Sequence, residues 1–247
     1  ATKTVPHVQD GAKSYRFTVR LGIRTTTDDA EGEPLATSPE RPTDDAIREA
    51  LRAFEGEIAQ VPPVFSAVKV AGARAYDLAR AGEIPELAPR PLTVAAIALV
   101  ARPDADHAEI EMTCGKGGYV RSVARDLGEA LGCHGHVSAL RRTKSGPFTL
   151  ADATIPFEKL GEMVQESGSA HLLPVAAGLD DIPALAVGAE EADRLRRGQG
   201  VPVPPSRVGE GRTVWAAADG VPVAIGTVRG GRFRPGRVFN LTVDETG

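Results

Sequence analysis

Aromatic residues, cysteines and long apolar runs are all scarce in this sequence of 247 residues. Aromatic side chains make up 4% of the chain, with only three tyrosines and one tryptophan, so the position of each one is informative. There are two cysteines, and no stretch is typical of a membrane span or a signal sequence. We therefore expect a soluble, cytoplasmic protein without disulfide bonds, built from one or two domains.

The sequence also lacks a net positive charge, yet its basic residues are concentrated. The formal net charge is −4, which by itself disfavours a nucleic-acid partner. Residues 114–146, however, carry six bases against two acids, whereas residues 28–60 carry ten acids against three arginines. A local basic stripe therefore exists inside an acidic protein, and only that stripe need contact RNA or phosphate.

Alternation and helical spacing predict the elements of the first two thirds. Residues 14–22 alternate apolar and polar side chains, which predicts a half-buried strand with Tyr15 on its apolar face. A polar loop follows, and Thr43 is expected to cap a helix whose first turn holds two aspartates. Two further strands are expected over residues 92–100 and 107–114, and helices over 73–81 and 120–131.

The final third has a different character. From about residue 174 onward, one capped helix is followed by short β-like runs that contain many prolines and glycines. Asp219 and Gly220 stand between two of these runs and predict a hairpin turn. This region is expected to be a small β-rich domain.

The stretch CGKGGYVRSVARDLG, residues 114–128, admits three interpretations. A phosphate cradle is disfavoured, because the glycine spacing and the trailing Lys-Ser/Thr of nucleotide-binding motifs are absent. A metal site would use Cys114, Cys133, His134 and His136, but an adjacent cysteine and histidine chelate poorly. The third interpretation is a glycine turn before a helix that holds Arg121 rigidly for a carboxylate or a phosphate.

The tyrosines and Arg121 also have plain structural interpretations. Tyr15 would be a core side chain of its strand, and Arg121 a solvated charge near the start of a helix. Spacing alone leaves both interpretations open.

Four ordered motifs resemble those of the TruB family of bacterial tRNA pseudouridine synthases: KSYRFTVRLGIRTTTDDAEG, VPPVFSAVKVAGARAYDLARAGE, CGKGGYVRSVARDLGEALG and HVSALRRTKSGPF. The resemblance covers roughly residues 1–160. It implies an α+β fold with a mixed, largely antiparallel sheet in a catalytic domain over residues 1–172. Residues 173–247 resemble the small PUA-like β-barrel domain that binds RNA in many members.

The resemblance implies the isomerisation of a tRNA T-loop uridine, at position 55, to pseudouridine, after the nucleotide is flipped out of its stack. It implies no cofactor and no metal, the tRNA T-arm as partner, no membrane and no obligate protein partner, and a monomer. Tyr15 is similar to the family tyrosine that stacks on the flipped base and is a possible proton-abstracting group. Tyr119 and Arg121 resemble the substrate-contacting tyrosine and the arginine that pairs with the catalytic aspartate. Leu140 resembles a leucine that lines the uracil pocket, and the expected contacts with the RNA backbone are Lys13, Lys69, Arg141 and Arg142.

One departure from the family pattern concerns the nucleophile. The family places its aspartate in a G-x-L-D-P-x-A-T-G segment upstream of an A-T-K triplet, and this sequence begins at that triplet and contains no such segment. Asp10, Asp28 and Asp29 match other positions of the family pattern and are not expected to replace it. We therefore expect an N-terminally incomplete form of a longer enzyme, inactive in isomerisation. A non-catalytic tRNA-binding or tRNA-folding protein on the same fold is the alternative.

Overall fold

The computed structural model describes residues 2–70, 72–83, 85–153, 156–167, 172–204 and 208–241, so Ala1 of the opening triplet lies outside it. The chain forms two compact units. One comprises Ala12–Lys144, and the other combines Ala1–Gly11 with Ser145–Gly247. The predicted domain boundary between residues 172 and 173 stays a prediction.

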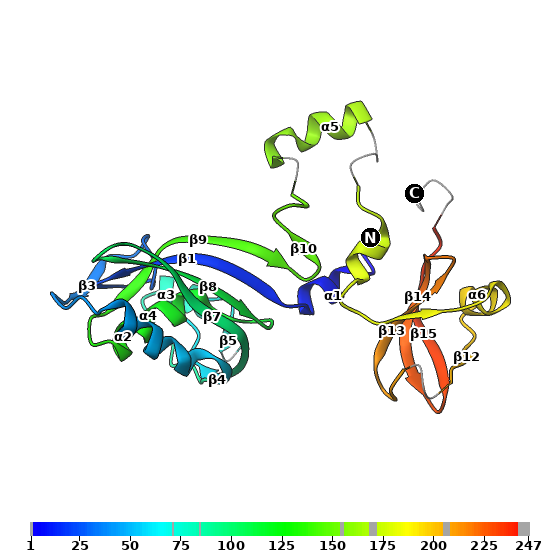
Figure 1. Ribbon diagram of the computed structural model, residues 1–247, viewed down its shortest axis with the longest axis horizontal. Coiled ribbons are helices and arrows are strands. Elements are labelled where there is room, and N and C mark those ends of the chain that lie inside the picture. Colours follow the sequence, from blue (N-terminus) through cyan, green and yellow to red (C-terminus); the bar gives the residue numbers. More distant parts are fainter. Residues whose placement is uncertain are drawn as a thin grey trace. The chain divides into compact units, whose positions relative to one another are not determined.

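The unit of residues 12–144 is built on an antiparallel sheet with helices on one face (Figure 1). In spatial order the strands are β9 (Gly135–Ser145), β1 (Lys13–Leu21), β8 (His107–Cys114), β7 (Arg90–Asp104) and β4 (Gly56–Gln60), and the helices are α2 (Asp44–Leu51) and α4 (Val120–Ala130). Strand β8 pairs antiparallel with both β1 and β7, and β4 pairs antiparallel with β7. Helix α2 packs against β7 and helix α4 against β1.

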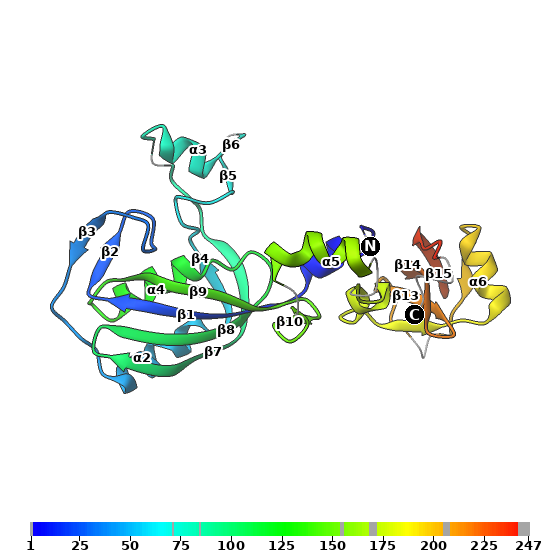
Figure 2. The same ribbon diagram turned by 90° about the horizontal axis from the view of Figure 1, so that it is seen from above.

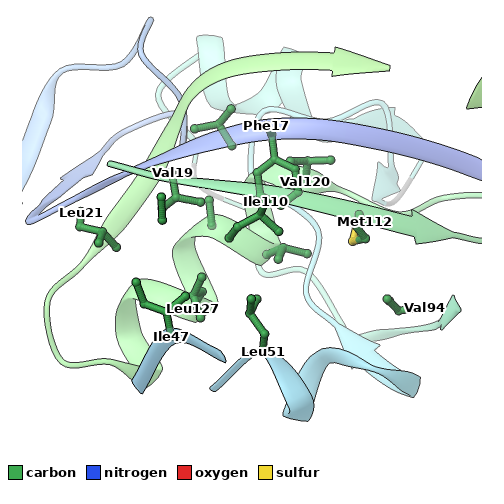
Figure 3. Close-up of a cluster of buried hydrophobic side chains, with 14 of the residues drawn as sticks. Phe17, Val19, Leu21, Ile47, Leu51, Val94, Ile110, Met112, Val120 and Leu127 are labelled. Carbon is green, nitrogen blue, oxygen red and sulfur yellow. The ribbon is translucent and has the colours of Figure 1, made fainter. Parts of the chain in front are cut away.

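The core of this unit lies between the sheet and the two helices (Figure 3). The alternation predicted for the first strand is confirmed, because Phe17, Val19 and Leu21 of β1 are fully buried. Full burial of an aliphatic or aromatic side chain contributes about 1.5–3 kcal/mol. The other members drawn in the figure include Ile110 and Met112 of β8, Ile47 and Leu51 of α2, and Val120 and Leu127 of α4.

Two small hairpins extend from this body. The polar loop predicted after β1 is the turn between β2 (Ile23–Thr25) and β3 (Pro34–Thr37), which form a two-stranded sheet of their own. A second hairpin, β5 (Lys69–Val70) with β6 (Ala73–Arg74), leads into helix α3 (Ala75–Arg80), and the three project away from the main sheet (Figure 2).

The other unit contains a second sheet, in the order β11 (Ala184–Ala186), β13 (Thr213–Ala218), β14 (Val221–Arg229), β15 (Arg232–Val238) and β12 (Val201–Pro202). The hairpin predicted at Asp219 and Gly220 is confirmed: both residues have positive φ, at 50° and 80°, and they join β13 to β14. Glycine and aspartate tolerate this conformation better than most residues. The other elements of this unit are α1 (Val5–Asp10), β10 (Phe148–Thr149), α5 (Leu160–Ser167) and α6 (Ala189–Arg196), with short 3₁₀ turns at Phe157–Lys159 and Val175–Leu179.

The predicted fold class is confirmed: an α+β protein with largely antiparallel sheets and a C-terminal β-rich part. Thr43 caps α2 as expected, since its hydroxyl accepts a hydrogen bond from the Ala46 amide at 3.2 Å. Pattern reasoning did not predict strands β4 and β9. Neither carries a regular apolar alternation, because β4 is a short strand and the second half of β9, residues 141–145, is entirely polar.

Candidate active site around Tyr119 and Arg121

Helix α4 begins at a glycine turn that brings the chain back over the sheet. Gly117 adopts φ +89°, a backbone conformation that is unfavourable for residues with a Cβ atom. Tyr119 then forms the N-cap, and the buried Gln60 of β4 fixes its backbone from both sides. The Gln60 amide oxygen accepts from Tyr119 N–H at 2.8 Å, and its amide nitrogen donates to Tyr119 C=O at 3.1 Å. The start of the helix is therefore held rigidly.

Arg121, in the first turn of α4, is held by three acceptors. Its guanidinium donates to Asp29 Oδ2 at 3.2 Å, to the Thr27 carbonyl at 3.3 Å and to the Phe65 carbonyl at 2.7 Å. The Arg121 and Asp29 side chains are 25% and 24% exposed, so the ion pair is largely shielded from water. A planar guanidinium with several partners has a fixed orientation. This agrees with the interpretation of residues 114–128 as a glycine turn before a helix that holds Arg121 rigidly. Arg121 is not a freely solvated charge.

Asp29 is the partner that sequence reasoning missed. Its carboxylate also accepts hydrogen bonds from the Thr27 hydroxyl and from the Glu31 amide, at 3.1 Å for the latter. These bonds are typical of Asx turns. The Thr- and Asp-rich composition of the loop favours such a turn, but it does not indicate that Asp29 pairs with Arg121. The pairing itself joins residues that are 92 positions apart, which no local pattern reveals.

Tyr119, Arg121 and Asp29 line one cavity of about 560 Å³, which is within the size range of small-molecule sites. Tyr76 of α3 lies in the same lining, and its ring is flanked by the guanidinium carbons of Arg74 and Arg80 at 5.8 and 5.5 Å from the ring centroid. Aromatic rings beside fixed cations can stack on a base and attract phosphate. The remaining lining residues are Thr27, Glu31, Phe65, Ser66, Ala67 and Arg80.

Tyr15 lines a different cavity, of about 280 Å³, which shares no lining residue with the first. It is partly buried on β1, opposite Met112 of β8. Arg142 of the adjacent strand β9 lies over the Tyr15 ring, 5.4 Å from its centroid. Leu140, which is 53% exposed, precedes Arg142 by two residues and so lies on the same strand face. The structure thus brings Arg142 to Tyr15, places Leu140 on the same face of β9 as Arg142, and groups Tyr119 with Arg121 separately.

The expected contacts with the RNA backbone differ in accessibility. Lys69 of β5 is exposed, as are Arg141 and Arg142 of β9. Lys13, in contrast, is buried at the start of β1, opposite Cys114.

The cysteines and histidines considered for a metal site form no such group. Within the described ranges, no three histidine, cysteine, aspartate or glutamate side chains could hold a metal ion together. Cys114 and Cys133 are buried free thiols, and burial raises the pKa of both, so the neutral form prevails at pH 7. His136 Nδ1 is hydrogen-bonded to the Ile23 carbonyl at 2.9 Å.

Among the helices in the described part of the chain, none has the length and apolar character needed to cross a membrane.

Two family models match the chain. The TruB family pseudouridylate synthase N-terminal domain matches residues 1–120, and the tRNA pseudouridylate synthase B C-terminal domain matches residues 121–180. In solved structures, the fold is similar to a chain of a Cbf5-Nop10-Gar1 complex, with a TM-score of 0.73 and 21% identity. That match covers 99% of this chain and 71% of the other. A chain of an H/ACA RNP bound to a substrate RNA containing 2′-deoxyuridine is similar with a TM-score of 0.71 and 18% identity. That match covers 100% of this chain and 71% of the other chain.

Curated relatives are similar over nearly the whole chain. The tRNA pseudouridine synthase B of Cereibacter sphaeroides is 58% identical over 242 residues, which are 98% of this chain and 80% of that protein. The protein of the same name from Dinoroseobacter shibae is 56% identical, over 97% of this chain and 79% of that protein. Identity at this level, together with the two matched models, shows that the chain belongs to the TruB family of pseudouridylate synthases.

Proposed function

We propose that this chain binds tRNA through the T-arm and receives the flipped uridine of position 55 at the cavity of Tyr119 and Arg121. The reaction it serves is the isomerisation of uridine to pseudouridine, as the names of its bacterial relatives suggest. The observation that carries the proposal is the fixed guanidinium of Arg121 in a cavity that an aromatic side chain also lines. Enzymes that act on a stacked base take it out of the helix into such a pocket.

Arg121 would act on the nucleophilic aspartate of the family motif. A carboxylate in a desolvated pocket has a raised pKa, and an adjacent guanidinium lowers that pKa again, which keeps the nucleophile ionised at neutral pH. Asp29 holds the guanidinium in place from the opposite loop. Because these 247 residues contain no G-x-L-D-P-x-A-T-G motif, we expect them to bind tRNA without isomerising it.

Tyr15 would stack on the flipped uracil, and Leu140 would lie beside it, so the flipped nucleotide would have to contact both the cavity that Tyr15 lines and the separate cavity of Tyr119 and Arg121. The partial burial of the ring and its contact with Arg142 favour a fixed orientation. Stacking of a base on an aromatic side chain contributes about 1–3 kcal/mol. In an active enzyme that carries the aspartate motif, Tyr15→Phe keeps the stack and removes the hydroxyl, so an unchanged rate would exclude the hydroxyl as the base.

The exposed cations Lys69, Arg141 and Arg142 would bind the RNA backbone. Lys13 is buried, so its charge would act on the RNA only at longer range. Residues 173–247 would add an RNA-binding surface as a PUA-like domain. Lysine and arginine contacts with phosphate weaken as salt rises, so the affinity for tRNA is expected to fall with increasing ionic strength.

Two measurements on the 247-residue chain test the proposal. Equilibrium binding of an unmodified tRNA transcript should be detectable, and should weaken when Arg141 and Arg142 are replaced by glutamine together. Release of tritium from C5-labelled uridine in the same tRNA should be absent. Robust tritium release would refute the requirement for the missing motif, and absence of tRNA binding would refute the proposed function itself.

A further inference from the structure

Helix α4 carries a second arginine, Arg125, one turn after Arg121. Residues four apart lie on the same face of a helix, so both guanidinium groups point in a similar direction. Neither Arg125 nor its partner Asp28 lines the cavity of Tyr119 and Arg121. Any effect of this pair on the cavity must therefore act through other residues.

Arg125 is more deeply buried than Arg121 and equally well bound. Its guanidinium donates to Asp28 Oδ2 at 3.2 Å, to Asp126 Oδ1 at 2.8 Å and to the Val61 carbonyl at 3.0 Å. The Arg125 and Asp28 side chains are only 13% and 10% exposed. An ion pair at this depth gains little net stability, because both charges lose their hydration. Burial raises the pKa of Asp28, and the Arg125 charge opposes this shift.

The two arginines bind the same two segments of chain. Arg121 contacts Asp29 and Arg125 contacts Asp28, which are consecutive residues of the β2–β3 turn. Arg121 also binds the carbonyl of Phe65, and Arg125 that of Val61, in the segment that follows β4. The arginine pair on α4 therefore joins the turn and this segment to the helix.

Asp28 itself has an unusual backbone. Its φ is +61°, in the left-handed region, where residues other than glycine persist only when their surroundings determine the conformation. Three contacts hold it: the Asp28 amide donates to the Thr25 carbonyl at 3.4 Å, the Val137 amide donates to the Asp28 carbonyl at 3.0 Å, and Arg125 binds the side chain. Because Asp29 is the next residue, the conformation of Asp28 sets the direction of the Asp29 carboxylate toward Arg121.

We infer that Arg125 is a positioning residue for the site: through Asp28 it fixes the turn that presents Asp29 to Arg121. This inference deepens the proposed function and rests on it for the link to RNA. The geometric part, from Arg125 to the Arg121–Asp29 pair, can be tested without any RNA.

The geometric test observes the Arg121 guanidinium by NMR in the 247-residue chain. The Nε–H signal of Arg121 is assigned by its absence in Arg121→Lys. We expect Arg125→Gln to shift and broaden this signal, and Arg125→Lys, which keeps the charge facing Asp28, to perturb it less. Arg48→Gln is the matched control, since Arg48 forms exposed ion pairs on α2 and should leave the signal unchanged. An unperturbed Arg121 signal in folded Arg125→Gln would overturn the inference.

A milder variant covers the case in which Arg125→Gln does not fold. Asp28→Asn removes the charge, while asparagine tolerates positive φ and keeps an oxygen that can accept from Arg125. It should shift the same Arg121 signal in a folded protein, and an unchanged signal would again contradict the inference.

The functional test uses an active enzyme that carries the aspartate motif. Arg125→Gln should lower kcat about tenfold, which corresponds to ~1.4 kcal/mol, with the Kd for a T-arm stem-loop RNA mostly kept, and Arg48→Gln should change neither. If the unmutated 247-residue chain fails to bind this RNA, the proposed function fails, while the NMR result still decides the positioning role. If the chain binds and Arg125→Gln leaves kcat unchanged, the inference fails and the proposed function stands.

Discussion

Gln60 holds the start of α4. Its replacement by methionine measures how much its two hydrogen bonds to Tyr119 contribute to stability. Methionine has a similar volume, so Gln60→Met keeps the packing and removes both hydrogen bonds to the Tyr119 backbone. Gln60 is 4% exposed, and water cannot readily replace its amide group.

The expected loss of stability follows from these two bonds. Each neutral hydrogen bond contributes about 1 kcal/mol net, and a buried donor left without a partner costs about 1–3 kcal/mol. The Tyr119 carbonyl keeps the Val123 amide as a donor, so the unpaired group is the Tyr119 N–H. We therefore expect a decrease of about 2–4 kcal/mol in the free energy of unfolding, with a fall in Tm of roughly 4–16 °C.

Urea and thermal unfolding followed by circular dichroism measure this change, and hydrogen exchange at the Tyr119 amide localises it. Gln199→Met is the matched control, because Gln199 is exposed and this substitution should leave stability within about 0.5 kcal/mol. A Gln60→Met protein as stable as the unmutated chain, with Tyr119 equally protected, would refute the reasoning.

Three further predictions concern other parts of the molecule. Hydrogen bonds from Arg20 and Arg41 lower the pKa of Asp106 to about 2, below its value in the unfolded chain; this stabilisation is fully present above about pH 4 and is lost as the pH falls toward 2. Asp106→Asn should therefore be less stable at pH 7, with the difference disappearing in acid unfolding curves near pH 2. Gly128→Ala should destabilise by about 1–3 kcal/mol in urea, since a Cβ there would lie 2.2 Å from the backbone of residues 134 and 135; Gly161→Ala, with open space around it, should not. In an active enzyme carrying the aspartate motif, Arg121→Lys should lower turnover strongly with tRNA affinity mostly kept, because lysine lacks the planar fork; steady-state kinetics with near-normal kcat would count against that role.

Local sequence patterns predicted the framework better than the site. The alternation of β1, the Thr43 cap and the Asp219–Gly220 turn each depend on neighbouring residues, and the structure confirms them. Strand β9 was not predicted, because its second half is polar and shows no apolar alternation. It is a strand because it pairs with β1.

The site depended on contacts between distant segments. The resemblance supplied Tyr119 and Arg121, but the partners that fix them, Gln60 and Asp29, are 59 and 92 positions away in sequence. Such pairs form where α4 meets β4 and the β2–β3 turn, and local propensity does not determine how these segments come together.

Crosslinking from the target nucleotide tests the central claim most directly. A T-arm stem-loop RNA with 4-thiouridine at position 55 is irradiated with the 247-residue chain, and the attached peptides are identified by mass spectrometry. The account predicts crosslinks to the residues that line the cavity of Tyr119 and Arg121, and their loss when unmodified RNA competes. Efficient crosslinks confined to residues outside this cavity would contradict it.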